Sequence, residues 1–240
     1  MDGRMVIRFA ALIAFLAALL FAPAGTLDWP GAWVFLAEMV VGGAAVSPWL
    51  ARHDPDLLRE RMAGVFQKDQ APADKIFMVF VQVGFYGWLA LMALDAKRWS
   101  LSHMPLWLNF VGAVLSASFF LSCWLVFREN SFAAPVVKIQ RERGQRVITT
   151  GPYAIVRHPM YAGGILYFVG LPLLLGSWIG LALAPILIVA LTLRIGLEER
   201  TLTQALPDRL HPARALPPHT GRLVTQTPGI KGRSSAFSDS

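Results

Sequence analysis

The sequence predicts an all-α, polytopic transmembrane protein with about six membrane-spanning helices. Of its 240 residues, 55% are hydrophobic and only 15% are charged. Long apolar runs recur along the chain, and a hydrocarbon core of about 30 Å needs roughly 20 apolar residues per helix. Six segments come close to that length: 5–23, 31–47, 76–94, 105–127, 161–176 and 178–196.

The first apolar run has some features of a signal peptide. Arg4 and Arg8 precede it, and the small residues around Ala22 follow it. However, the run is longer than the about 7–15 apolar residues of a typical signal core, and further spans follow. We therefore expect it to be retained as the first transmembrane helix.

The positive charges predict the orientation of the spans. The formal net charge is +7, and all of the 22 Lys and Arg residues except Lys97 and Arg98 fall on one side of a six-span arrangement. The positive-inside rule then places both termini in the cytoplasm, as in a bacterial inner membrane. Because the charge lies between apolar runs, it favours contact with the lipid bilayer over binding of nucleic acid.

Two large loops, 48–75 and 128–160, share the cytoplasmic face in this topology. In the first loop, Asp54 or Asp56 can cap a short helix that has Pro55 in its first turn. Leucines and methionine on one face of this helix, with charges on the other, would suit the membrane surface.

The second loop leads into the fifth span. Its stretch 145–150 is prone to form β structure, and its backbone groups could bind a ligand. His158 precedes a proline, which disfavours α geometry at His158 and suits Pro159 to the first position of a helix. The last two spans are separated only by Gly176 and Ser177, so they should form a tight helical hairpin.

Few side chains inside the spans are ionisable. Cys123, the single cysteine, lies in an apolar run and is expected to be an inert buried thiol. The scattered histidines show no metal-ligand spacing, so we expect no metal site. Glu38 is the one acid in the middle of a span, and it is either a paired structural carboxylate or a functional group.

Polar residues converge where the fifth span begins and where the sixth ends. The exposed amides of a helix that begins near His158 attract an anionic group. Arg194 and Glu198 are four residues apart and therefore share a helix face. A simple ion pair between these two side chains, without any ligand, is the alternative interpretation.

The order of these motifs resembles the isoprenylcysteine carboxyl methyltransferase family, part of a wider group of membrane methyltransferases that includes phospholipid N-methyltransferases. The chain reads Gln-x-Val-x-Thr-x-Gly-x-Tyr from Gln145, then Arg-His-Pro-x-Tyr-x-Gly from Arg157, then Glu-Glu after the apolar hairpin. The similarity covers about residues 128–202. The loop 54–62 is similar to that of bacterial members.

The resemblance implies S-adenosylmethionine as the cofactor, bound between the loop before span five and the end of span six. The residues implied as its contacts are Gln145, Arg146, Val147, Ile148, Tyr153, His158, Pro159, Met160, Tyr161 and Glu198. Arg194 matches the arginine that faces the substrate in the eukaryotic members. The implied reaction is carboxyl O-methylation of a lipophilic, isoprenylcysteine-like small molecule or lipidated substrate. Because a carboxylate is already ionised at pH 7, we expect no catalytic base.

The chain divides into three expected parts. Residues 1–127 hold the N-terminal transmembrane helices and the first cytoplasmic loop, residues 128–206 the methyltransferase core, and residues 207–240 an atypical tail. The tail has five prolines and Phe237 as its only aromatic residue, so we expect it to be disordered. It departs from bacterial relatives, which continue with Leu-Pro-Gly-Tyr, and translation in a shifted frame would give such a segment.

Other functions stay open from the sequence. One is methylation of a phospholipid or another small molecule. A second is reduction by a sterol-type membrane reductase that uses NADPH, for which Arg141 and Arg143 are candidate phosphate ligands. A third is a non-enzymatic membrane scaffold or transporter. The sequence identifies neither the methyl acceptor nor the oligomeric state.

Overall fold

The computed structural model describes residues 3–64, 66–67, 70, 72–136, 143 and 148–205, with only the backbone described at 197 and 200–205. All regular secondary structure in these ranges is helical, which confirms the all-α fold class. The long helices are α1 (Gly3–Ala24), α2 (Pro30–His53), α4 (Pro72–Ala93), α5 (Leu106–Glu129), α6 (Pro159–Leu175) and α7 (Trp178–Ala205).

These six helices coincide with the six apolar segments of the sequence. Five of them are long and apolar enough to cross a membrane, with α4 continuing into the π-helix η1 (Leu94–Arg98); α6 is a shorter apolar helix of 17 residues. Their outer faces expose large apolar side chains, for example Phe80 (74% exposed) and Phe110 (71% exposed). Such a surface requires lipid to cover it, so the chain is a multi-pass membrane protein.

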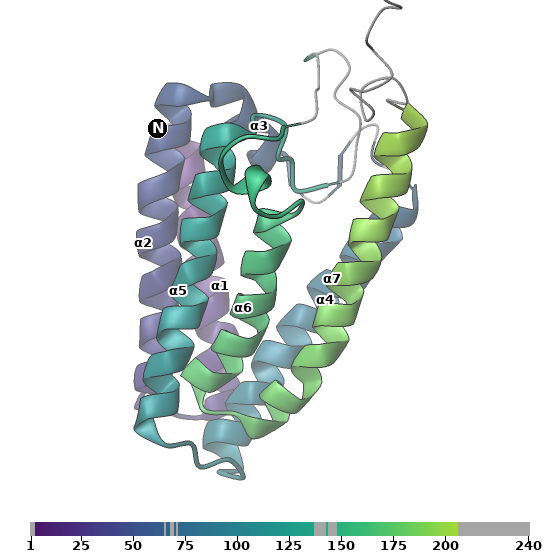
Figure 1. Cartoon of the computed structure of the whole chain (residues 1–240). Helices are drawn as coiled ribbons and strands as arrows, with labels where there is room; N and C mark the ends of the chain where they lie inside the picture. Colours follow the sequence, from purple (N-terminus) through teal and green to yellow (C-terminus); the bar gives the residue numbers. More distant parts are fainter. Residues whose placement is uncertain are drawn as a thin grey trace, which may run out of the picture.

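The helices run side by side and form a bundle with two distinct ends (Figure 1). One end carries the short helix α3 (Pro55–Met62), the start of α1, the connection from α5 to α6 and the end of α7. We call it the α3 end. The opposite end carries the connection from α4 to α5 and the α6–α7 turn, and we call it the turn end. The described parts of the loops 48–75 and 128–160 thus share one face of the molecule, as the sequence predicts.

Helices α5 and α6 pack closely through glycine. A Cβ atom on Gly112 would lie 2.2 Å from the backbone nitrogen of Leu174, and one on Gly170 would lie 2.7 Å from that of Ser116. Small residues at such positions let membrane helices approach at backbone distance. This close packing holds α6 against α5. The Arg-His-Pro-x-Tyr motif lies at the start of α6.

The local signals for helix boundaries are confirmed. Asp54, and not Asp56, caps α3, because the Leu57 N–H donates to Asp54 Oδ1 at 2.9 Å. His158 is the cap residue of α6, with Pro159 directly after it. Gly176, at φ 78°, ends α6 and makes the tight turn into α7. Residues 148–150 form no strand, and 145–147 lie outside the described residues, as does the expected tail 207–240.

Candidate functional site

A hydrogen bond joins the start of α6 to the end of α7. Tyr161 lies in the first turn of α6 and is buried, and its hydroxyl donates to Glu198 Oε2 at 2.6 Å. The two residues are 37 positions apart in the chain. The Arg-His-Pro-x-Tyr motif and the Glu-Glu motif therefore meet in one place at the α3 end.

A second contact runs beside the first. His158 Nε2 lies 3.0 Å from Glu199 Oε1, and the His158 ring packs 5.6 Å from the Tyr161 ring. The Glu199 side chain is about half exposed, at 52%, whereas that of His158 is 24% exposed. Two consecutive glutamates of α7 thus contact His158 and Tyr161 at the start of α6.

Arg194 does not pair with Glu198, so the simple ion pair considered from their spacing is wrong. Its Nε donates to Asp74 Oδ1 at 3.4 Å, and its Nη2 donates to the Pro135 carbonyl at 2.6 Å. The physical reason is tertiary packing: α4 lies along α7, and this brings the first turn of α4 to the Arg194 side chain (Figure 1).

Asp74 is a site residue that the sequence analysis missed. It is fully buried, and besides Arg194 it accepts a hydrogen bond from Gln70 Nε2 at 2.8 Å. The one signal in the sequence is an acid just before an apolar run. Acids are common in the first turn of helices because they complement the helix dipole, so this signal is weak.

Tyr153 extends the cluster on the α5 side. It lies in the 3-10 helix η3 (Gly151–Ala154), and Asn130 Nδ2 donates to its hydroxyl oxygen at 2.7 Å. Burial raises the pKa of Tyr153, the Asn130 contact opposes this, and the nearby charge of Glu198 raises it further. The phenol is therefore neutral at physiological pH. Asn130 was not expected from the sequence.

An apolar cluster lies beneath these groups. Its buried members are Leu50, Leu57, Cys123, Val126, Phe127 and Ala133. Tyr153 and Met160 pack against it, so the predicted aromatic and thioether contacts line one wall of the site. Pro159 is buried at the start of α6. Such a wall can exclude water from the polar groups above it.

For four predicted site residues, no contact with this cluster is described. Gln145, Arg146 and Val147 lie outside the described residues. Ile148 is partly buried, and within the described part of the chain it forms no hydrogen bond with Tyr161 or Glu198. These assignments stay predictions.

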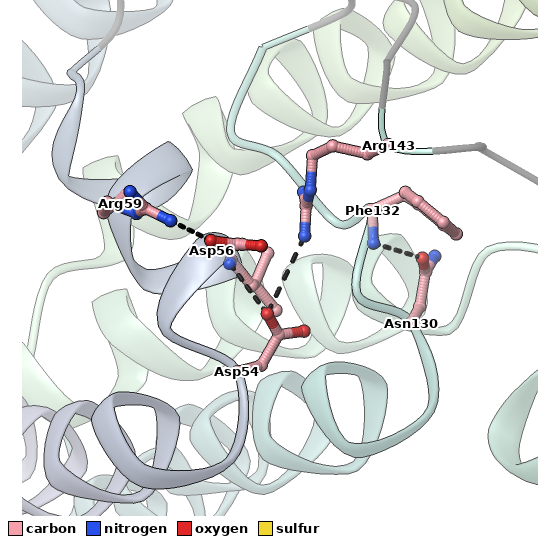
Figure 2. A network of polar contacts seen from close by, with 7 residues as sticks. Asp54, Asp56, Arg59, Asn130, Phe132 and Arg143 are labelled. Carbon is pink, nitrogen blue, oxygen red and sulfur yellow. Dashed lines mark hydrogen bonds and ion pairs between the residues drawn. The ribbon is translucent and has the colours of Figure 1, made fainter. Parts of the chain in front are cut away.

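Arg143 belongs to a separate polar network (Figure 2). Its Nη2 lies 3.7 Å from Asp54 Oδ1, the carboxylate that caps α3, and its guanidinium lies 5.5 Å from the Phe132 ring centroid. Its charge is therefore already compensated in part, which weakens the case for Arg143 as a phosphate ligand. Arg141 lies outside the described residues.

Other candidate groups lie away from the site. Among the described residues, no three His, Cys, Asp or Glu side chains are grouped so that they could hold a metal. Glu38 accepts a hydrogen bond from Ser116 at 2.7 Å. It lines a lateral groove of about 600 Å³ between α2 and α5, together with apolar residues such as Val41 and Trp124.

Comparison with known proteins finds similarity in the part of the chain that contains these site residues. Residues 107–209 match the family model described as phospholipid methyltransferase. Protein-S-isoprenylcysteine O-methyltransferase B of Arabidopsis thaliana is 28% identical over 109 residues, which is 45% of this chain and 52% of the relative. The aligned region thus spans about half the length of that relative. No solved structure matches.

The matched range begins at the start of α5 and extends past α7, so it includes Tyr153, His158, Tyr161, Arg194 and Glu198. The resemblance that the motifs predicted is therefore confirmed by comparisons that do not depend on those motifs alone. From α5 to α7, this multi-pass helical membrane protein is thus similar to the phospholipid methyltransferase family and to an isoprenylcysteine O-methyltransferase.

Proposed function

We propose that this protein is an S-adenosylmethionine-dependent methyltransferase that methylates the carboxylate of a lipophilic, isoprenylcysteine-like acceptor. The observation that carries the proposal is the 2.6 Å hydrogen bond between Tyr161 and Glu198. It joins the two motifs implied for cofactor binding. With both termini in the cytoplasm, this site faces the cytoplasm, where the cofactor is made.

The residues at the α3 end fit the polar groups of this cofactor. The Glu198 carboxylate can accept hydrogen bonds from ribose hydroxyls or pair with the ammonium group. His158 and the amides at the start of α6 suit the cofactor carboxylate. Tyr153 and Tyr161 supply aromatic walls, with Met160 and Pro159 beside them. Gln145, Arg146, Val147 and Ile148 complete the proposed set.

The proposed reaction makes modest demands on the chain. When bound, the cofactor supplies a methyl group already activated on a sulfonium. A carboxylate acceptor carries no proton to remove, which agrees with a proposal that assigns no catalytic base. The chain's own residues align the acceptor and exclude water. Arg194, held by Asp74 and the Pro135 carbonyl, is the proposed substrate contact.

The first test is a titration of the detergent-purified protein with S-adenosylmethionine and, separately, with NADPH by isothermal calorimetry. We expect saturable binding of S-adenosylmethionine and none of NADPH. Binding of NADPH alone would instead identify a membrane reductase. If neither ligand binds, both the methyltransferase and the reductase assignments are rejected, and a scaffold or transporter is favoured.

The second test identifies the type of acceptor. Membranes that contain the protein are incubated with methyl-labelled cofactor, and the extracted lipids are treated with alkali. Carboxyl methyl esters release volatile labelled methanol, whereas N-methyl groups are stable. We expect alkali-labile label. Stable label would identify phospholipid N-methylation, the second candidate, which the description of the matching family model favours.

A further inference from the structure

Arg61 is a partly buried cation whose contacts with described residues are a carbonyl group and an aromatic ring. Its Nη1 donates to the Ala133 carbonyl at 2.8 Å, and its guanidinium carbon lies 4.3 Å from the centroid of the Phe127 ring. Within the described part of the chain, no carboxylate forms an ion pair with it. Burial lowers the pKa of Arg61, the Cys123 thiol opposes this, and the charge of Arg194 adds to the lowering.

Arg61 and Arg194 are neighbours although they come from α3 and α7. Arg61 binds the carbonyl of Ala133, and Arg194 binds that of Pro135, two residues along the same segment. Two residues span at most about 7 Å of extended chain, so both guanidinium groups are anchored within that distance. Asp74 is the carboxylate that pairs with Arg194. Among the described residues, Asp74 is therefore the one carboxylate that forms an ion pair with either of these two neighbouring cations.

This arrangement of two cations has a free-energy cost unless an anion binds to it. A charged group removed from water needs a counter-charge or good hydrogen bonds, and two like charges in proximity add repulsion. Arg59, on the same short helix, shows the ordinary alternative. Its side chain is 79% exposed and pairs with Asp56 (Figure 2). Arg61 instead turns inward, toward α5 and α7.

We propose that Arg61 and Arg194 form one anion-binding site, which receives the carboxylate of a membrane-borne prenyl or acyl amphiphile. Guanidinium groups bind carboxylates through paired N–H···O bonds. The apolar cluster that contains Leu57, Cys123 and Phe127 lies beside Arg61 and suits the first carbons of a lipophilic chain. The inference rests on the proposed function in one respect, since this carboxylate would be the methyl acceptor. It adds Arg61 to that proposal as a second binding residue for the carboxylate.

The test compares an acid with its neutral ester. Full-length protein in neutral-lipid nanodiscs is titrated, without S-adenosylmethionine, with N-acetyl-S-farnesylcysteine and with its methyl ester, and binding is followed by thermophoresis. The variants are Arg61→Gln, Arg61→Lys and the matched control Arg59→Gln. Partition of the probe into lipid is the same for all variants, so affinity ratios are meaningful.

We expect Arg61→Gln to weaken binding of the acid by about tenfold to a hundredfold, the range for loss of a hydrogen bond to a charged group. Binding of the ester should change by less than about twofold. Arg61→Lys keeps the charge but loses the planar guanidinium group, so its affinity for the acid should lie between those of the wild type and Arg61→Gln. Arg59→Gln should match the wild type. Thermal unfolding of each variant checks folding, and Arg61→Lys carries the test if Arg61→Gln does not fold.

Equal affinity of the acid for the wild type and for both Arg61 variants would overturn the inference. So would a wild type that binds acid and ester alike. If Arg61→Gln loses affinity for S-adenosylmethionine but keeps that for the acid, Arg61 serves the cofactor and the inference is wrong. If phosphatidic acid, titrated in parallel, binds more tightly than the acid in an Arg61-dependent way, the anion is a lipid phosphate and the carboxylate assignment fails. An Arg61-dependent preference for the acid, in a protein that does not bind S-adenosylmethionine, would support this site and reject the proposed function.

Discussion

The two ends of the helix bundle both hold a buried aspartate, but their surroundings differ. At the turn end, Asp95 is fully buried, and its Oδ2 accepts hydrogen bonds from Ser102 (2.7 Å) and Ser177 (2.5 Å). The Ile179 N–H also points to Oδ2, at 3.3 Å, while Oδ1 has no partner among the described residues. These partners belong to the turn that joins α6 to α7, to the first turn of α7, or to the connection from α4 to α5.

At the α3 end, the polar side chains come from elements that are distant in the chain. Asp74 of α4 holds Arg194 of α7, and Tyr161 of α6 holds Glu198. Arg61 adds a cation with no carboxylate partner among the described residues. At the turn end, hydroxyl and backbone donors from one turn region surround a single carboxylate and stabilise the turn. At the α3 end, two neighbouring cations have one carboxylate partner among the described residues, which indicates a ligand site. The first end thus supports the fold, and the second binds ligands in our account.

The largest effect is expected for Glu198→Ala. If Glu198 binds the cofactor directly, as proposed, its loss should reduce affinity for S-adenosylmethionine by about a hundredfold or more, equivalent to about 3 kcal/mol. Glu199→Ala is the matched control, because Glu199 is the next residue and its side chain is more exposed. It should change the affinity by less than about fivefold. If calorimetry shows that Glu198→Ala binds S-adenosylmethionine with the wild-type affinity, the assignment of Glu198 to the cofactor site is wrong.

Asp95→Ala should affect stability and not ligand binding. It leaves the Ser102 and Ser177 hydroxyls without their buried acceptor, so we expect the free energy of unfolding to fall by about 2–3 kcal/mol. Affinity for S-adenosylmethionine should stay within about twofold for the folded fraction. Asp28→Ala, at an exposed position of the same end, should cost less than about 0.5 kcal/mol. Denaturant unfolding in detergent measures both, and equal costs would remove the contrast between the two ends.

Arg194→Ala should impair turnover more than cofactor binding. We expect kcat/KM for the acceptor to fall by about thirtyfold, or about 2 kcal/mol, because the substitution removes the proposed charged contact with the substrate. Asp74→Asn should give a smaller loss of about fivefold to tenfold, since Arg194 loses only its anchor. Lys75→Gln, at the adjacent exposed position, serves as the control. If Arg194→Ala lowers only the affinity for S-adenosylmethionine, Arg194 contacts the cofactor and not the substrate.

The smallest effect is expected for Tyr153→Phe. The substitution removes the acceptor of the Asn130 hydrogen bond and should cost about 0.5–1.5 kcal/mol of stability. Because burial raises the pKa of Tyr153 above its usual value near 10, the unfolded state loses the proton first. The stability from this shift is present below pH 10 and is lost as pH rises through the folded pKa. Wild type should therefore lose stability more steeply than Tyr153→Phe above pH 10; parallel curves would contradict this.

The sequence was sufficient to predict the helices and the two motifs of the site. Span length and apolar composition are local properties, so all six long helices were found. The His158–Pro159 pair marked the start of α6 because proline restricts the residue before it. Tyr161 and Glu198 were assigned through the family resemblance, and the structure brings them into contact.

Long-range partners could not be predicted in the same way. Helical spacing suggested that Arg194 pairs with Glu198, but packing of α4 against α7 gives it Asp74. Asp95 stood at the end of a span, and nothing local indicated that Ser102 and Ser177 would surround it. Arg61 was considered only as part of a surface helix. In each case the decisive neighbour lies more than five residues away in the chain, and tertiary packing supplies it.

Hydrogen–deuterium exchange with and without saturating S-adenosylmethionine tests the central claim most directly, because one experiment covers both ends of the bundle. We expect the cofactor to slow exchange in peptides that cover 151–163 and 190–200. Peptides that cover 94–105 and 176–180 should be unchanged. Protection confined to the turn end, or no protection at the α3 end under conditions where the cofactor is bound, would contradict the account.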